Sequence, residues 1–457
     1  MLPLLRAYHE DPATLHIGCE PPAAYLMPFD SPAAASEGLR GASRFFRSLC
    51  GDWNFRYFPS LCRMGGVPAL GTVPVEEERL PVPMSWQYAL GRGFDTPDYI
   101  NQKYPFPVDP PHVPQDNPVG IYERTFFCRR TPGKRQRLIF EGVDSCFYLF
   151  VNGTFAAYSQ VSHCISEIDV TDLLRDGENT LRVAVLKWCD GSYLEDQDKF
   201  RLSGIFREVY LLERDADGLR DVYLHPVTAP DFRTGVLTAE LRLAGALPVS
   251  WRLTDPDGNT VGAGESLPEK GEATLTCPVA SPALWSDEIP ALYTLELVCG
   301  TECFSIPVGF RELCIRDRTV LLNGKKIKAK GVNRHDSHPY LGAAVPYDRM
   351  ERDLLEIKSY NINMIRTSHY PPDPRLPELC DRLGLYLCLE SDLETHGFRR
   401  LGDWSRLTDD PAWQAAYLDR AERMFERDKN HPSVLLWSMG NESGTGCNYR
   451  AIYDYLH

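Results

Sequence analysis

The stretch LPELCDRLGLYLCLESDLETHG, residues 376–397, decides the fold of the C-terminal part of the chain. A helix is expected to end before Gly384, because glycine readily takes the left-handed conformation that closes a helix. The apolar run at 385–390 predicts a buried strand, and the polar residues after it predict a loop at the carboxyl end of that strand. A helix followed at once by a buried strand is typical of βα units with parallel strands.

Similar units flank this stretch. Strands are predicted at 327–331, 363–367 and 434–439, and helices are predicted to begin at Asp348, with Glu351 completing a capping box, after Asp410 and at Cys447. Four consecutive βα units indicate a doubly wound sheet or part of a (β/α)8 barrel. Residues 316–457 are about half of the roughly 250 in a complete barrel. We therefore expect a partial TIM-barrel catalytic domain, the first half of the barrel, either truncated or completed by another chain.

Upstream of residue 316, short β-rich runs alternate with turn residues. Residues 41–214 predict a jelly-roll β-sandwich and residues 215–315 an immunoglobulin-like β-sandwich. Residues 1–40, rich in proline, alanine and serine, predict a poorly specified arm. The segment 101–118 has six prolines and is expected to form a long surface loop. The predicted fold class is therefore multidomain, with β domains followed by an α/β domain.

The composition excludes several functional classes. The 49 Lys and Arg against 63 Asp and Glu give a net charge of −14, which disfavours nucleic-acid binding. The longest apolar runs are far shorter than the ~20 residues of a membrane-spanning helix, and no secretory apolar segment follows the N-terminus. The 14 cysteines form no CxxC pair, which is typical of reduced thiols. We expect a cytoplasmic protein that binds neither nucleic acid nor membrane.

Polar clusters follow all four predicted barrel strands, at 333–338, 366–371, 394–397 and 441–443. Barrel enzymes place their active sites at the carboxyl ends of the strands, so we expect these clusters to meet. Glu394 and His396 lie on the same side of an extended segment, because side chains alternate along it. With Glu442 they are candidate ligands of Mg²⁺ or Mn²⁺, which carboxylate-rich sites prefer over zinc. The alternative is a salt bridge between Glu394 and His396 at the rim.

These sequences resemble family 2 glycoside hydrolases, in particular the bacterial β-galactosidases that hydrolyse lactose. The resemblance rests on GVNRH at 331–335, RTSHYP at 366–371, ETHG at 394–397, NHPSV at 430–434, GNES at 440–443, and on 188–207 in the first sandwich. It extends from about residue 53 to the end and keeps the domain order of the family. It implies an enzyme that hydrolyses terminal, non-reducing β-D-galactose residues by a retaining double displacement.

Site residues follow from the same resemblance. It implies that Glu442 is the general acid/base, that Asn441 contacts the 2-hydroxyl of the sugar, and that Glu394, His396 and Glu442 bind Mg²⁺ or Mn²⁺. The resemblance also assigns further roles. His335 and His369 would stabilise the transition state, Arg366 would lie near the nucleophile, Asn101 and Asp198 would reach the galactosyl ring, and Asp198 would bind Na⁺.

The resemblance places the nucleophile, a second glutamate, on a later barrel strand that this sequence does not include. We therefore expect the isolated 457-residue chain to be inactive, with a complementing C-terminal chain as one possible source of that strand. Family members also suggest a homo-oligomer. Two alternatives stay open: a β-glucuronidase or β-mannosidase of the same family, and a non-catalytic carbohydrate-binding or assembly fragment.

Overall fold

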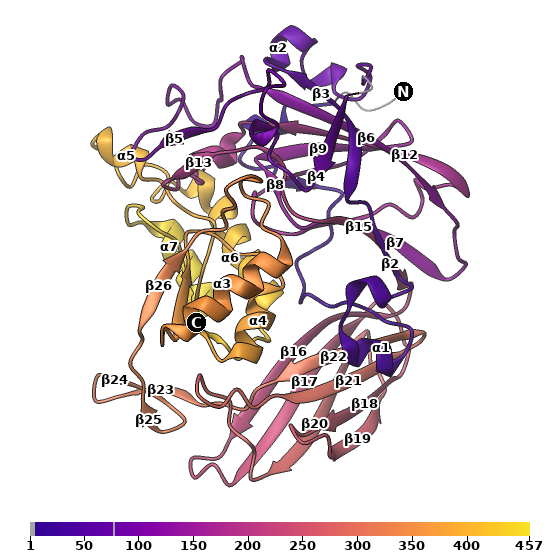
Figure 1. Ribbon diagram of the computed structural model, residues 1–457, viewed down its shortest axis with the longest axis vertical. Helices are drawn as coiled ribbons and strands as arrows, with labels where there is room; N and C mark the ends of the chain where they lie inside the picture. The colour runs from indigo at the N-terminus through magenta and orange to yellow at the C-terminus, as the bar shows by residue number, and fades with distance from the viewer. Residues whose placement is uncertain (1–4, 76–77) are drawn as a thin grey trace.

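The computed structural model describes residues 5–75 and 78–457 and consists of two β-sandwiches and a parallel α/β unit (Figure 1). The fold class predicted from the sequence is confirmed. The first sandwich lies at the top of Figure 1, the second at the bottom, and the α/β unit, in orange and yellow, beside them. No helix in the described residues combines the length and the apolar character that crossing a membrane demands.

The first sandwich contains a seven-stranded sheet, in the order β1-β10-β9-β12-β6-β3-β4, and a four-stranded sheet, β11-β7-β15-β2. Asn152 and Gly153 form the hairpin turn that joins β9 to β10, and both residues have positive φ. The strands are β1 (His16–Ile17), β2 (Phe46–Ser48), β3 (Gly51–Phe58), β4 (Arg79–Val82), β6 (Val119–Cys128), β7 (Lys134–Phe140), β9 (Cys146–Val151), β10 (Thr154–Gln160), β11 (Ser166–Asp169), β12 (Gly177–Leu186) and β15 (Val209–Asp215). Two short ribbons pair β5 (Asp98–Ile100) with β13 (Lys199–Arg201) and β8 (Val143–Asp144) with β14 (Gly204–Ile205).

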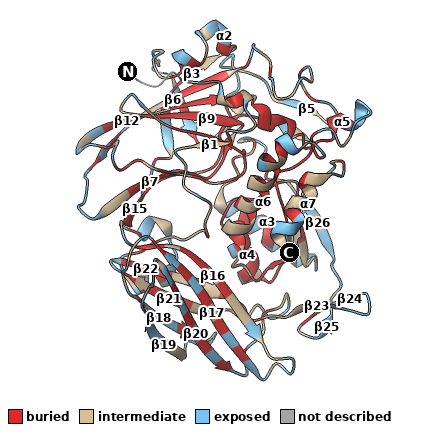
Figure 2. Ribbon diagram, turned by 180° about the vertical axis from the view of Figure 1, so that it is seen from behind, coloured by how far each residue is buried: buried red, intermediate tan, exposed pale blue. Residues whose placement is uncertain are grey.

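The second sandwich pairs sheets β16-β17-β20 and β19-β18-β21-β22. Its strands alternate buried and exposed residues, most regularly in β20, because one face packs on the core and the other meets solvent (Figure 2). The strands are β16 (Leu219–Thr228), β17 (Thr234–Leu243), β18 (Val249–Thr254), β19 (Thr260–Ser266), β20 (Glu272–Ala280), β21 (Tyr293–Cys299) and β22 (Glu302–Val308).

The α/β unit has four parallel strands in the order β26-β27-β28-β29, preceded by a three-stranded sheet of β23 (Leu313–Arg316), β24 (Thr319–Leu322) and β25 (Lys325–Lys326). Asn333 pairs with Arg366, and Glu390 with Ser438, so the carboxyl ends of the parallel strands lie at one edge. The elements are β26 (Gly331–Arg334), α3 (Tyr347–Ser359), β27 (Met364–Thr367), α4 (Leu376–Leu383), β28 (Tyr386–Glu390), α5 (Gly397–Arg400), η6 (Pro411–Trp413), α6 (Gln414–Asp428), β29 (Val434–Ser438) and α7 (Cys447–Leu456).

Two local predictions in the α/β unit are wrong. The first parallel strand lies later than predicted, because Asn333 and Arg334 join the sheet by pairing with Arg366 and Thr367. Helix α3 begins at Tyr347 after Pro346, and no side chain caps it, so the predicted capping box is absent. The fixed φ of a proline suits the start of a helix even without a side-chain cap.

Residues 5–40, within the segment expected to be a poorly specified arm, form short regular elements and long-range contacts. His16 lies in β1 beside β10 and its Nε2 contacts Asp419 of α6 at 3.0 Å. The amide of Ala24 donates to Asp221 of the second sandwich at 2.9 Å, and α1 (Pro32–Glu37) packs on β22. The segment therefore connects all three parts. Since each contact joins residues far apart in sequence, local composition does not reveal it.

The proline-rich segment 101–118, expected to be a surface loop, contributes to a domain contact instead. Tyr104, Phe106 and Val113 are buried and form a core cluster with Phe398 of the α/β unit. The hydroxyl of Tyr104 donates to the carbonyl of Tyr193 at 2.8 Å. The prolines exclude the segment from the sheets, but its apolar side chains pack between the first sandwich and the α/β unit.

Asp381 of α4 ties that helix to the start of β29. Its side chain is fully buried and contacts His431 Nδ1 at 2.6 Å, and it accepts the amide of Ser433 at 2.9 Å. Burial alone would lower the pKa of His431, but the Asp381 carboxylate outweighs burial and the pKa lies above its usual value. The protonated imidazole is therefore favoured in the folded state.

We expect Asp381→Asn to lower the free energy of unfolding by about 3 kcal/mol, because a buried charge then loses its partner. A histidine whose pKa is raised by folding stabilises the folded state fully at pH values below its unfolded pKa of about 6.5. This stabilisation is lost as the pH rises through the pKa of the folded state. The loss should therefore be larger at about pH 6 than at about pH 9. Urea unfolding at both pH values checks this. Asp348→Asn, which removes an exposed pair with Arg352, is the control and should change little.

Candidate active site

The carboxyl ends of the four parallel strands carry the candidate site. His335 follows β26, His369 follows β27, Glu390 ends β28 and Glu442 follows β29. Parallel strands place their carboxyl ends at one edge of the sheet, so these residues lie close together. Their position at the end of a strand is the sequence feature that indicates this. The structure thus brings together the four clusters that the sequence predicts to meet.

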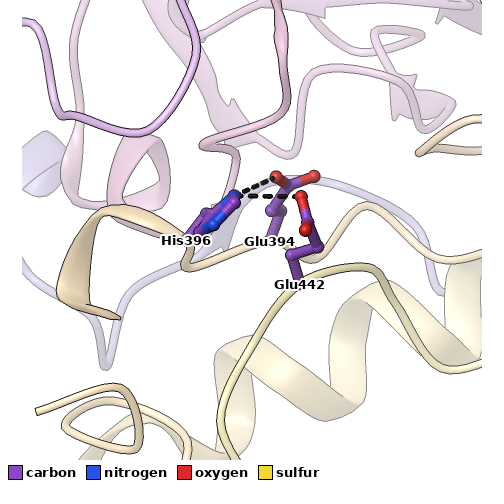
Figure 3. A group of neighbouring side chains, drawn as sticks. All are labelled: Glu394, His396 and Glu442. Carbon is purple, nitrogen blue, oxygen red and sulfur yellow. Dashed lines mark ion pairs between the residues drawn. The ribbon is translucent and has the colours of Figure 1, made fainter. Parts of the chain in front are cut away.

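Glu394, His396 and Glu442 form the tightest group (Figure 3). His396 Nδ1 lies 2.9 Å from Glu442 Oε2 and 3.8 Å from Glu394 Oε1. One potential ligand atom from each residue lies within 4.8 Å of the others. Glu394 and His396 are buried, whereas the side chain of Glu442 is 45% exposed. Glu442 therefore faces the open side of the group.

The electrostatics of this group suit a cation. Burial, helped by the nearby Asp196 and Glu442 carboxylates and opposed by a hydrogen bond from Asn441, raises the pKa of Glu394 to about 8. Asn441 Nδ2 donates to Glu394 Oε2 at 2.9 Å, but Glu394 Oε1 is buried without a hydrogen-bond partner. Two carboxylates and an imidazole with an unsatisfied buried oxygen match the donor set of Mg²⁺ or Mn²⁺. The alternative, a salt bridge between Glu394 and His396, has a long separation of 3.8 Å between His396 Nδ1 and Glu394 Oε1.

Glu390 is the centre of a second group and was missed by the sequence analysis. It accepts hydrogen bonds from Arg366 Nε at 2.8 Å, His369 Nδ1 at 2.6 Å and Ser438 Oγ at 2.6 Å. Burial would raise the pKa of Glu390, but these bonds together hold it below its usual value. Arg366 Nη2 also donates to Asn441 Oδ1 at 2.8 Å, which links the two groups. A carboxylate at the last position of a buried strand is the signal that could have identified it.

His335 and His369 face each other across the ends of β26 and β27. Their ring centroids lie 5.4 Å apart in an edge-to-face arrangement. The hydroxyl of Tyr370 lies 3.3 Å from His335 Nδ1 and accepts the amide of Asp336 at 3.2 Å. Burial, followed by the charges of His369 and Lys199, lowers the pKa of His335 to about 4. His335 is therefore neutral at pH values near 7.

The first sandwich contributes Asp198 to this region. Asp198 and His335 line the same pocket of about 190 Å³, together with Tyr99, whose hydroxyl donates to Asp198. Asn101, which was expected to reach the sugar, is exposed and is not among the lining residues of this pocket. The structure thus brings Asp198 to the site, and the side chain of Asn101 hydrogen-bonds Tyr99 beside it.

Backbone pairing between the first sandwich and the loop after β28 positions Glu394. Its amide donates to the carbonyl of Leu194 at 2.7 Å, and its carbonyl accepts the amide of Asp196 at 3.1 Å. Asp196 Oδ2 in turn accepts the amide of Gly397 at 2.8 Å. The first sandwich therefore holds this loop at Glu394 and at Gly397, on either side of His396. Nothing in the sequence around 194–196 indicates this pairing.

Three family models match the chain. They are "Glycosyl hydrolases family 2, sugar binding domain" at residues 46–215, "Glycosyl hydrolases family 2" at 218–311 and "Glycosyl hydrolases family 2, TIM barrel domain" at 313–457. Together these models account for nearly all of the chain after residue 45, in three consecutive domains.

Two curated relatives are similar in sequence. The chain is 42% identical to a β-galactosidase of Actinobacillus pleuropneumoniae over 99% of this chain and 47% of that protein. It is 41% identical to a β-galactosidase of Pectobacterium atrosepticum over 91% of this chain and 41% of that protein. The chain therefore spans less than half the length of these relatives.

Solved structures resemble the fold at lower identity. A β-glucuronidase of Bifidobacterium dentium complexed with coumarin-3-O-glucuronide has a TM-score of 0.73 at 21% identity and covers 90% of this chain and 71% of that chain. A β-glycosidase of Bacteroides vulgatus has a TM-score of 0.70 at 23% identity and covers 90% of this chain and 52% of that chain. Both support the architecture alone.

Proposed function

Because the chain belongs to family 2 of the glycosyl hydrolases, we propose that an enzyme containing it hydrolyses terminal β-D-galactosides, lactose among them, with retention of configuration. The observation that carries this proposal is the grouping of Glu394, His396 and Glu442 at the strand ends, linked through Asn441 to Arg366. The two β-galactosidase relatives support the galactoside.

Glu442 is proposed as the general acid/base. Its partly exposed carboxyl can reach a leaving oxygen, while Glu394 is buried and Glu390 is occupied by its own partners. In the first step Glu442 gives its proton to the glycosidic oxygen, and in the second it removes a proton from the attacking water. Asn441 is proposed to bind the 2-hydroxyl of the sugar.

Metal ions are proposed at two places. Glu394, His396 and Glu442 would hold Mg²⁺ or Mn²⁺, and the unsatisfied oxygen of Glu394 supports this assignment. Such an ion supplies a fixed positive charge beside the acid/base. Asp198 would bind Na⁺ at the sugar pocket, since a carboxylate is a hard oxygen donor.

A retaining mechanism needs a second carboxylate about 5–5.5 Å from the acid/base. The two buried glutamates of the site have other roles: Glu394 belongs to the metal group, and Glu390 is bonded to Arg366, His369 and Ser438. We propose that the nucleophile comes from a further barrel strand outside the four βα units described here. That strand would belong to a longer polypeptide that contains this sequence or to a complementing chain.

The substrate is tested on a fusion enzyme, in which this chain is joined to the unmatched remainder of the Actinobacillus pleuropneumoniae relative. Among nitrophenyl β-galactoside, β-glucuronide and β-mannoside, we expect kcat/KM for the galactoside to be about 100-fold or more above the others, because polar pockets reject sugars that leave their groups unpaired. The unfused chain is the control and should show no turnover above background.

A higher rate on the glucuronide or the mannoside would assign the enzyme to that branch of the family instead. Calorimetric binding of galactose by a folded fusion that hydrolyses none of the three substrates would favour a carbohydrate-binding fragment.

A further inference from the structure

The hydroxyl of Tyr370 connects one of the site histidines to the backbone of the loop after β26. We propose that Tyr370 is a positioning residue that fixes His335 in the tautomer protonated at Nε2, so that His335 offers a hydrogen-bond donor to a sugar hydroxyl. The tautomer stands on the hydrogen bonds of the chain itself, and only its use toward a sugar rests on the proposed function.

The direction of the hydrogen bonds follows from proton counting. The amide of Asp336 can only donate, so the oxygen of Tyr370 accepts at 3.2 Å and its own proton must be directed elsewhere. His335 Nδ1 lies 3.3 Å from the same oxygen and is the acceptor available to that proton. A neutral imidazole carries a proton on one nitrogen alone. Because Nδ1 of His335 accepts, Nε2 carries the proton.

The ring of Tyr370 is held in place by the first sandwich. The imidazole of His163 stacks on it with centroids 3.8 Å apart and planes 12° apart. His163 Nδ1 contacts Asp392 at 2.8 Å, and Lys199 Nζ lies 3.0 Å from His163 Nε2 and 4.6 Å from the centroid of the Tyr370 ring. Tyr370 is only 3% exposed. Its hydroxyl therefore has little freedom to turn away from His335.

The protonation states of the two partners agree with this arrangement. Burial raises the pKa of Tyr370 well above its usual value, so the hydroxyl keeps its proton. Burial lowers the pKa of His335 to about 4, so the imidazole is neutral and a tautomer is defined. His335 also lines the pocket that contains Asp198, so its orientation matters to a bound sugar.

His369 provides an internal contrast. Its Nδ1 donates to Glu390 Oε1 at 2.6 Å, so in its neutral form it carries the proton on Nδ1, the opposite of His335. The two perpendicular rings thus differ in which nitrogen is protonated, although both follow a parallel strand of the same sheet. A method that reports the protonated nitrogen of each histidine separates the two.

Nitrogen-15 NMR on the chain labelled at its histidines tests the proposal without substrate. We expect His335 to show a protonated Nε2 and an unprotonated Nδ1, with the resonances assigned by their loss in His335→Gln. In Tyr370→Phe, which keeps the ring but removes the hydroxyl, the Nδ1-protonated form should become populated. Tyr104→Phe is the matched control, since it removes another buried hydroxyl between the same two domains and should leave the His335 resonances unchanged.

A protonated Nδ1 on His335 in the unsubstituted chain overturns the proposal, whether or not Tyr370→Phe folds. An unchanged His335 spectrum in a folded Tyr370→Phe chain also overturns it. In the fusion enzyme, Tyr370→Phe should lower kcat for a galactoside about fivefold and KM less, as expected for one hydrogen bond. If the fusion enzyme does not act on galactosides while the spectra are as expected, the proposed function fails and the tautomer assignment stands.

Discussion

Glu442→Gln in the fusion enzyme should lower kcat for lactose about 1000-fold, the middle of the range for the loss of a general acid/base. Glutamine has nearly the same shape, but it cannot give a proton to the leaving oxygen. Because the side chain of Glu442 is 45% exposed, the substitution should leave the fold intact. KM should change little, since the lost interaction acts on proton transfer. Glucose release at saturating lactose measures the effect.

The control for this prediction is Glu378→Gln, at an exposed glutamate of helix α4. It removes a carboxylate of the same type at a distance from the strand ends and should leave kcat unchanged. A Glu442→Gln enzyme with kcat within about tenfold of the parent would place the acid/base elsewhere.

Glu394→Gln should weaken Mn²⁺ binding by the chain about 100-fold or more. Glu394 supplies a buried carboxylate whose Oε1 has no hydrogen-bond partner, and a neutral amide cannot replace its charge next to a cation. Electron paramagnetic resonance of free Mn²⁺ during titration measures the affinity and needs no enzymatic activity. Glu378→Gln again serves as the matched control.

Metal binding should also stabilise the fold, because an ion that binds only the native state raises the free energy of unfolding of the protein. We expect Mn²⁺ to raise the melting temperature of the parent chain but not that of Glu394→Gln, and a chelator to reverse the rise. Equal Mn²⁺ affinity in the parent and in Glu394→Gln would contradict the assignment of the three ligands.

The parallel unit was predictable because its signals are local. Each βα unit has an apolar strand and an amphipathic helix, as in β28 and in α6 with its buried Tyr417 and Met424. Once the strands are parallel, their carboxyl ends share one edge, so the topology brings the loops that carry Glu394, His396 and Glu442 to the same edge. The side-chain distances in that group needed the structure.

Other features depend on contacts between residues far apart in sequence. The amide of Glu394 donates to Leu194 of the first sandwich, and His16 contacts Asp419, although neither pair has a shared local pattern. The place of Glu390 at the end of β28 is a local signal, but its partners lie on the flanking strands β27 and β29 and in the loop after β27, so its role needed the structure. The role of Asn101 at the sugar stays a prediction from the resemblance.

The dependence of kcat/KM on the leaving group tests the role of Glu442 most directly, because kcat/KM reports the bond-cleavage step and not the later attack of water. An alcohol needs a proton to leave, whereas a dinitrophenolate leaves unaided, so the loss of a general acid should slow only poor leaving groups. For Glu442→Gln in the fusion enzyme, we predict a strong loss with lactose and little loss in the bond-cleavage step with dinitrophenyl β-galactoside. An equal loss of kcat/KM with both substrates would contradict the assignment of Glu442 as the proton donor.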